Sequence, residues 1–210
     1  MLPLKDDIPS PRPPVATLAL IVVVIGLAIS GWHPDLDAMP WPVAAMVAAL
    51  LTGGIVQLAV NLLFLWLFGR SVEGSIGAVG LLAVYFVGAI VAAGAENLLG
   101  GSSIPATGGA GAIAAVVAAH CVLHPRARII CFVLIPFFFT FVLIPAVVLG
   151  AVWLGLQAFN PIGDTAGAAF PGDPGVTVAA LGGALIFGAA VAAVVRSRGL
   201  ARLEPGQPAY

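Results

Sequence analysis

Charged side chains are scarce in this sequence. Aspartate, glutamate, lysine and arginine together make up 8% of the 210 residues, whereas soluble globular proteins contain about 25%. A chain with so few charges cannot coat a folded surface against water. The formal net charge is −1, so the sequence also lacks the basic surface that a nucleic-acid-binding protein needs. These shortages exclude a soluble domain and a nucleic-acid partner.

Cysteine and histidine are nearly absent as well, with two cysteines and three histidines in the chain. Cys121 and Cys131 both lie near the membrane face that we expect to be reducing, so no disulfide is predicted. His120 and His124 share one helix face beside Cys121, and we expect them at the cytoplasmic interface. A structural zinc site needs four ligands, and the neighbouring sequence supplies no others. We therefore expect neither a metal ion nor another cofactor.

Long apolar segments are what the sequence does contain. Apolar residues make up 61% of the chain and the mean hydropathy is +1.13. Six stretches stand out: roughly 14–31, 43–68, 77–98, 108–123, 129–158 and 175–196. About 20 apolar residues cross a bilayer as a helix, so five of the six qualify at once. The pattern predicts an all-α membrane protein with six transmembrane helices at 14–196, a cytoplasmic lead-in at 1–13 and a cytoplasmic tail at 197–210.

The fourth stretch is too short to cross the bilayer by itself. At about 1.5 Å per residue it reaches about 24 Å, less than the ~30 Å hydrocarbon core. It must therefore begin below the membrane surface, after non-helical backbone that protein surrounds. The preceding residues 100–109 are rich in turn formers and suit this role. The sequence thus predicts a short, buried fourth helix with a site at its start.

The distribution of charge predicts the orientation. With six spans, every lysine and arginine falls on one side of the membrane: Lys5, Arg12, Arg70, Arg126, Arg128, Arg196, Arg198 and Arg202. The opposite loops carry only acidic charges: Asp35, Asp37, Glu96, Asp164 and Asp173. Because basic loops stay in the cytoplasm, both termini are expected to be cytoplasmic. Cleavage of the first stretch as a signal peptide would break this pattern, and its N-terminal flank is not basic.

A glycine-rich motif opens the fourth stretch. Residues 104–113 read Ile-Pro-Ala-Thr-Gly-Gly-Ala-Gly-Ala-Ile, which resembles the Gly-x-Ser-Gly-Ala-Ile signature of the rhomboid intramembrane serine proteases. Further segments at 53–69, 124–128, 135–140 and 143–145 are similar to the second span, the turn after the fourth and the fifth span of bacterial members. The resemblance implies a rhomboid-like bundle in the bacterial cell (inner or plasma) membrane.

The resemblance also implies a catalytic pair that this chain lacks. Rhomboids use a serine at the start of the fourth helix and a histidine on the sixth, and neither works alone. Ala110 stands at the serine position. Residues 179–183 resemble the family's Ala-His-x-Gly-Gly, which places Ala180 at the histidine position. We therefore predict no catalytic residue.

Other parts of the family's site are kept in altered form. Rhomboids place a histidine four residues before an asparagine, and both help to stabilise the oxyanion. Here Gln57 stands at the histidine position and Asn61 is retained. With Gly108, Gly109, Ala110 and Ala180, they make up the candidate substrate-binding set. Gln57 and Asn61 can form a carbonyl-binding pocket, or they can bond the second helix to the fourth, which the lack of catalytic chemistry favours.

Small residues recur every four positions in the fourth and sixth stretches. The two rows are Ala110, Ala114 and Ala118, and Ala180, Ala184, Gly188 and Ala192. Such rows let helix backbones approach closely, which drives association inside a membrane. We predict that the two helices pack together and that Ala110 faces Ala180 at less than about 10 Å, the usual spacing of packed helix axes.

The leading hypothesis is a catalytically inactive rhomboid-like protein. It would bind transmembrane segments of client proteins within the lipid bilayer, in an oligomeric state that the sequence leaves open. The first alternative is an active endopeptidase with substitute residues, for which Ser102, Ser103, Thr107 and Thr177 supply hydroxyls but no base. The second is a transporter or channel, which needs ionisable groups inside the spans, where this sequence has almost none.

Overall fold

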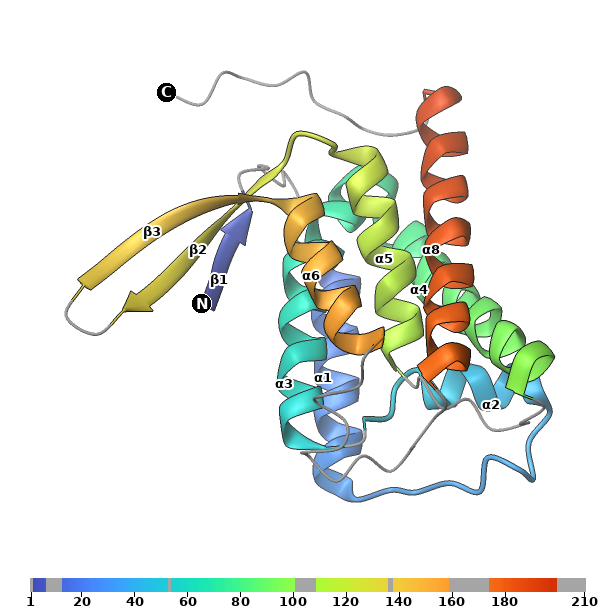
Figure 1. Cartoon of the computed structure of the whole chain (residues 1–210). Helices are drawn as coiled ribbons and strands as arrows, with labels where there is room; N and C mark the ends of the chain where they lie inside the picture. The colour runs from blue at the N-terminus through green and yellow to red at the C-terminus, as the bar shows by residue number, and fades with distance from the viewer. Residues whose placement is uncertain are drawn as a thin grey trace.

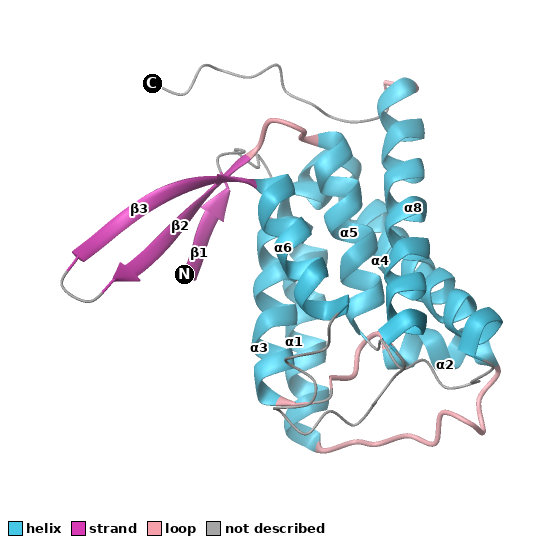
Figure 2. Ribbon diagram, in the orientation of Figure 1, coloured by secondary structure: helices cyan, strands magenta, loops and turns pink. Residues whose placement is uncertain are grey.

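Helix α5 (Gly109–Leu123) lies at the centre of a helical bundle, and a small antiparallel sheet projects from one end (Figures 1 and 2). The computed structural model describes residues 2–6, 13–52, 54–100, 109–135, 138–158 and 174–199. The other helical elements are α1 (Val15–Ser30), α2 (Trp41–Ala48), α3 (Ile55–Phe64), the π-helical segment η1 (Leu65–Gly69), α4 (Arg70–Gly100), α6 (Ala146–Ala158) and α8 (Pro174–Ser197). The strands are β1 (Leu2–Asp6), β2 (Arg128–Ile135) and β3 (Phe138–Pro145).

Gly77 reverses the chain between two long helical runs. Residues 55–76 continue in one direction through α3 and η1, and the rest of α4 returns beside them (Figure 1). The φ angle of Gly77 is 82°, a conformation that residues with a Cβ rarely adopt. Each run is long enough to cross a hydrocarbon core of ~30 Å at about 1.5 Å per residue.

Two helices among the described residues pass a length-and-hydropathy test for spanning a membrane. They are Ile55–Leu99, which joins the two runs, and Val178–Ser197. Val15–Ser30, Gly109–Leu123 and Ala146–Gln157 are apolar but shorter. The structure is therefore mostly helical, as predicted, but the count of six transmembrane helices stays a prediction.

The prediction of one fifth helix over 129–158 is wrong for its first half. Residues 128–135 and 138–145 pair as the antiparallel strands β2 and β3, in which Arg128 pairs with Pro145 and Ile135 with Phe138. Strand β1 joins the open side of β2, with Leu2 opposite Phe132, so the chain is not all-α and the lead-in is partly a strand. This segment is rich in β-branched and aromatic residues, and an apolar run has no period that separates strand from helix.

The second predicted span also begins later than expected. Residues 41–48 form the separate helix α2, and the main helix starts only at Ile55. Gly53 and Gly54 interrupt the apolar run, and Gly54 is extended with φ of −179°. Glu96, expected in an outer loop, lies inside α4 and is 2% exposed. The apolar run alone could not show that α4 continues to Gly100.

Glycines bring three helices into close contact with α5. A Cβ on Gly88 of α4 or on Gly188 of α8 would overlap Ala115, and one on Gly150 of α6 would lie 2.8 Å from Val117 Cγ1. Nearly every side chain of α5 is buried as a result. The predicted short, buried fourth helix is thereby confirmed. So is the close packing of the fourth helix with the sixth, since α8 runs beside α5 in the same direction (Figure 1).

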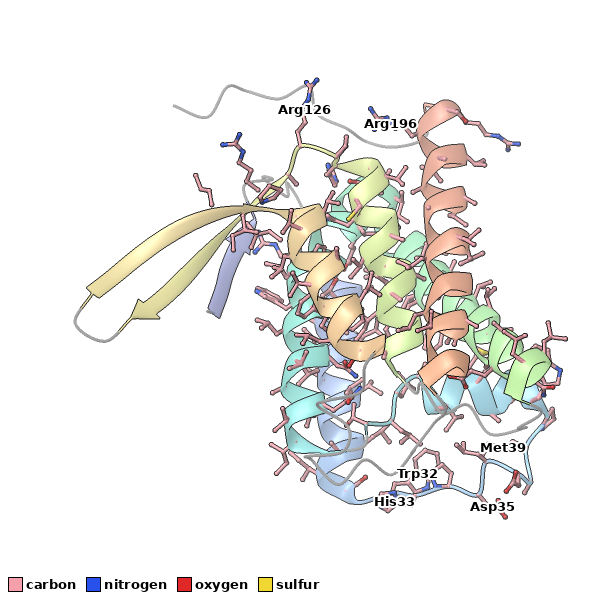
Figure 3. The ribbon with its side chains drawn as sticks, viewed as in Figure 1. Trp32, His33, Asp35, Met39, Arg126 and Arg196 are labelled. Carbon is pink, nitrogen blue, oxygen red and sulfur yellow. The ribbon has the colours of Figure 1, made fainter. Side chains whose placement is uncertain are left out.

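The two ends of the bundle carry different charges. Arg126 and Arg196 lie at one end, and Trp32, His33 and Asp35 lie at the other (Figure 3). Arg196 Nη1 donates a hydrogen bond of 2.8 Å to the carbonyl oxygen of Val122. Arginine there offsets the partial negative charge of the α5 C-terminus. We call the two ends of the bundle the arginine end and the acidic end.

A buried carboxylate caps the first turn of α1. Pro14 precedes the helix and makes no side-chain cap. Instead, Glu73 of α4 accepts hydrogen bonds from the amides of Ala16 and Thr17 at 2.8 Å each, and from Thr17 Oγ1 at 2.7 Å. An anion is favourable there because the first amides of a helix lack internal acceptors. Glu73 therefore connects α1 to α4.

Replacing Glu73 by alanine is expected to destabilise the protein by at least about 3 kcal/mol. Hydrogen bonds to a charged group contribute about 1.5–3 kcal/mol each, and the buried amides of Ala16 and Thr17 would lose their acceptor. Thermal unfolding in detergent micelles measures the effect. Glu73→Gln keeps one acceptor oxygen and is expected to lose less. Unchanged melting of Glu73→Ala would show that this cap contributes little.

Candidate functional site

The candidate site lies where the start of α5 meets α3 and the non-helical backbone after α2. A Cβ on Gly109 would lie 2.9 Å from the carbonyl oxygen of Ala49, 3.3 Å from Asn61 Nδ2 and 3.7 Å from the carbonyl oxygen of Leu51. Only glycine lets the helix begin this close to two backbone carbonyls and an amide. Gly109 is thus placed as the family resemblance implies, beside Asn61.

Asn61 is buried without a hydrogen bond. It is 4% exposed, and within the described residues neither Oδ1 nor Nδ2 has a partner. An unpaired buried polar group costs about 1–3 kcal/mol of folding stability, so this amide is an unfavourable group in an apolar bundle. The predicted role of bonding the second helix to the fourth has no hydrogen bond to support it in this part of the chain.

Gln57 and Gly108 are the remaining two residues of the predicted substrate-binding set. Gln57 is half-buried one turn before Asn61 on α3, and the spacing of four residues puts both on one face. Gly108 lies outside the described residues, as do Ser102, Ser103 and Thr107 of the predicted loop. Gln57 therefore extends the polar face of α3 away from the buried amide.

The two positions at which the family resemblance expects a catalytic pair, Ala110 and Ala180, are both buried. Ala110 is 4% exposed and Ala180 is fully buried, and both belong to one buried apolar cluster. Each lies near the start of its helix, at the same end of the bundle (Figure 1). Methyl groups supply neither a nucleophile nor a base. Their separation of less than about 10 Å stays a prediction.

Tyr85 is a site residue that the sequence reasoning missed. Its side chain is 1% exposed, and its hydroxyl donates a hydrogen bond of 2.7 Å to the carbonyl oxygen of Ala49. This bond holds the non-helical backbone of residues 49–51 against α4, next to Gly109. The available signal was a tyrosine inside an apolar span, because a buried phenol needs a partner.

A serine–histidine pair lies at the other end of α5. Ser75 Oγ and His124 Nε2 are 2.8 Å apart, and Ser75 Oγ also donates to the carbonyl oxygen of Ser71 at 3.0 Å. A hydroxyl has only one proton to donate. When Ser75 donates it to the carbonyl oxygen of Ser71, Ser75 Oγ can only accept a hydrogen bond from the imidazole of His124. General-base catalysis needs the opposite polarity. His124 is also about 20 Å from Ala110 by helical rise.

His120, which we expected at the cytoplasmic interface, is buried in the bundle in the last turn of α5. It is 0% exposed, and its ring packs edge-on against Phe68 at 4.9 Å and near His124 at 5.3 Å. The close packing around α5 buries even its last turn. Across the described residues, no three histidine, cysteine, aspartate or glutamate side chains are grouped as a metal site would require.

Comparison with known families gives one match. The family model described as Rhomboid domain matches residues 39–198. The matched part runs from just before α2 to the end of α8 and contains every candidate site residue. Comparisons with curated proteins and with solved structures found no match.

Proposed function

This chain belongs to the rhomboid family of membrane proteins, whose members are normally serine proteases, and we propose that it is an inactive member that binds transmembrane segments of other membrane proteins. The observation that carries the proposal is a buried amide, Asn61, beside Gly109, with alanines at both positions of the catalytic pair. A buried polar side chain therefore remains beside the position at which the family carries its nucleophile.

The inactive part of the proposal follows from the chemistry of acyl transfer. The reaction needs a nucleophile, a base and hydrogen-bond donors for the oxyanion. Ala110 and Ala180 remove the first two, and Asn61 keeps part of the third. The Ser75–His124 pair lies at the opposite end of α5, about 20 Å from Ala110 by helical rise. A donor without a nucleophile binds a carbonyl but does not cleave it.

The binding part rests on the unpaired state of Asn61. A transmembrane segment that unwinds locally exposes backbone groups that must find partners inside the membrane. Its carbonyl would accept from Asn61 Nδ2, and its amide could donate to the carbonyl oxygens near Gly109. Binding would relieve unpaired groups on both molecules, each costing about 1–3 kcal/mol. This favours client segments with weak helical structure near one end.

We also propose that both termini face the cytoplasm. The arginine end of the bundle contains Arg126 and Arg196, and the acidic end contains Asp35 (Figure 3). Basic residues stay on the cytoplasmic side during insertion. The candidate site would then lie toward the outer leaflet, because Gly109 begins α5 at the acidic end.

Client binding can be tested with a photo-crosslinking amino acid at Leu58, which is half-buried beside Gln57. We expect discrete polypeptide adducts in cells, identified by mass spectrometry. The matched control places the crosslinker at Val79, which is 81% exposed on α4. Asn61→Leu removes the amide at similar volume without leaving an unpaired group, so the fold should persist while the Leu58 adducts fall several-fold. Adducts that Asn61→Leu leaves unchanged would contradict binding through this amide.

A further inference from the structure

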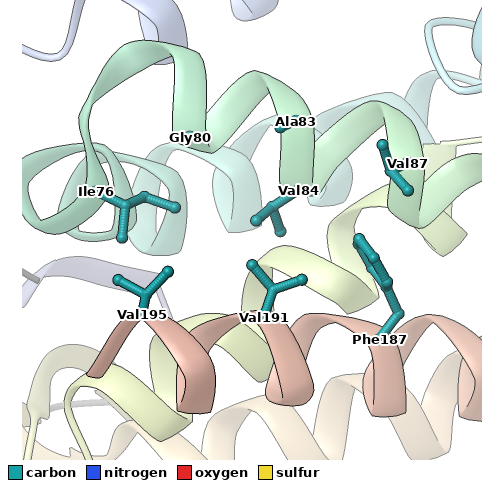
Figure 4. A pocket seen from close by; sticks show the side chains of 8 residues that line it. All are labelled: Ile76, Gly80, Ala83, Val84, Val87, Phe187, Val191 and Val195. Carbon is teal, nitrogen blue, oxygen red and sulfur yellow. The ribbon is translucent and has the colours of Figure 1, made fainter. Parts of the chain in front are cut away.

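An apolar groove separates α4 from α8 on the side of the bundle away from α1. Its lining includes Ile76, Gly80 and Val84 of α4 and Phe187, Val191 and Val195 of α8 (Figure 4). Its volume is about 280 Å³. No polar side chain lines it, and none of the candidate site residues borders it. The groove is therefore a separate feature of the surface that faces the membrane.

The groove ends toward the acidic end, where α4 and α8 are in contact, and its lining extends from there toward the arginine end. At Gly183 the two helices are in contact, since a Cβ there would lie 3.4 Å from Ala95 Cβ and 3.6 Å from Val91 Cγ1. Ile76 and Val195 face each other across the gap farther from this contact (Figure 4). A Cβ on Gly80 would lie 2.8 Å from Ile76 Cγ1, so the Ile76 side chain packs against this glycine. An elongated ligand would therefore enter from the arginine end.

The length of the groove matches one leaflet of a bilayer. Residues 187–195 rise about 12 Å along α8, and residues 78–87 rise about 14 Å along the part of α4 that follows Gly77. These lengths are about half of the ~30 Å hydrocarbon core. A transmembrane helix needs about 20 residues and crosses both leaflets, so this groove would leave half of it without contact. A single acyl chain from one leaflet fits the available length.

A guanidinium group lies just beyond the groove at the arginine end. Arg198 is exposed three residues after Val195, and its amide still bonds the carbonyl oxygen of Val194 at 3.1 Å. The helical spacing therefore continues the face of Val191 and Val195 into Arg198. Guanidinium groups bind phosphate oxygens with charge-assisted hydrogen bonds. Arg196, in contrast, is bonded to Val122 of α5.

We propose that this groove binds one acyl chain of an anionic phospholipid, whose phosphate contacts Arg198. An apolar gap beside lipid is filled by chains, because an empty one forfeits dispersion contacts. Packing in the groove holds the chain, and the guanidinium selects a negatively charged headgroup. The lipid would come from the leaflet on the arginine side and would join α4 to α8 where their own side chains do not meet.

The test uses the full chain in nanodiscs of phosphatidylcholine with a small fraction of phosphatidylglycerol carrying a diazirine in its acyl chain. After irradiation, mass spectrometry should locate the adducts mainly within residues 76–87 and 187–195. Val191→Phe fills the groove and should reduce this labelling several-fold. The matched control Ala193→Phe adds the same ring at an exposed position of α8 and should leave the labelling unchanged.

A second pair of variants tests the headgroup without touching the packed helices. Arg198→Gln should abolish the preference for phosphatidylglycerol over an equally photoactive phosphatidylcholine. Arg126→Gln removes an exposed charge at the same end (Figure 3) and should keep the preference. Adducts spread evenly over the bundle, or insensitive to both Val191→Phe and Arg198→Gln, would overturn the proposal. So would a co-purified polypeptide crosslinked to the groove where the lipid probe gives no adduct.

Discussion

Replacing Gly188 by alanine is expected to destabilise the protein by about 3 kcal/mol or more, although the change adds one methyl group. A Cβ there would overlap the backbone of Ala115 on α5, which cannot turn away as a flexible side chain would. Overpacking a well-packed core costs about 1–3 kcal/mol, and backbone overlap is at the upper end of that range or beyond. The two helices would have to separate at the contact between Gly188 and Ala115.

The same substitution six residues earlier is the matched control. Gly182 lies on the same helix, and a Cβ there would meet no atom within 4 Å. Alanine is up to about 1 kcal/mol more favourable than glycine inside a helix, so Gly182→Ala should stabilise the protein slightly. Unfolding curves in mixed detergent micelles would compare the two variants. A loss of similar size in both, or none in either, would show that close α5–α8 packing does not hold the fold.

The sequence predicted those features that depend on residues within one segment of the chain. A span too short for the bilayer predicted that α5 is buried, and small residues every four positions predicted its packing against α8. Both follow from helix dimensions and side-chain size along one segment. The residues that resemble the rhomboid signature likewise pointed to Gly109 and Asn61, which the structure brings together.

The sequence was less informative where partners lie far apart in the chain. Nothing near Glu73 indicates that its carboxylate caps α1, which begins almost 60 residues earlier. The bond from Tyr85 to Ala49 is equally remote. The strands at residues 128–135 and 138–145 were mistaken for a helix because apolar character alone does not set the backbone. The unpaired amide of Asn61 could be recognised only once its surroundings were known.

The unmodified protein is expected to show no protease activity. It should neither react with fluorophosphonate probes, which label activated serines, nor cleave a transmembrane substrate that an active rhomboid cleaves in the same detergent. Both positions that the family uses for chemistry are methyl groups in this chain, Ala110 and Ala180. Each is buried against neighbouring helices, so no side chain from solvent can take its place. The active rhomboid serves as the positive control for probe and substrate.

Restoring the serine alone should also fail. Ala110→Ser supplies a hydroxyl without a base, and such a hydroxyl is a poor nucleophile at neutral pH. Adding Ala180→His and Gln57→His gives the one route to weak labelling, and it requires the fully buried position 180 to admit an imidazole. Labelling of the unmodified chain would contradict the inactive assignment. If Ser75→Ala then abolished that labelling, the pair of Ser75 and His124 would be the active centre.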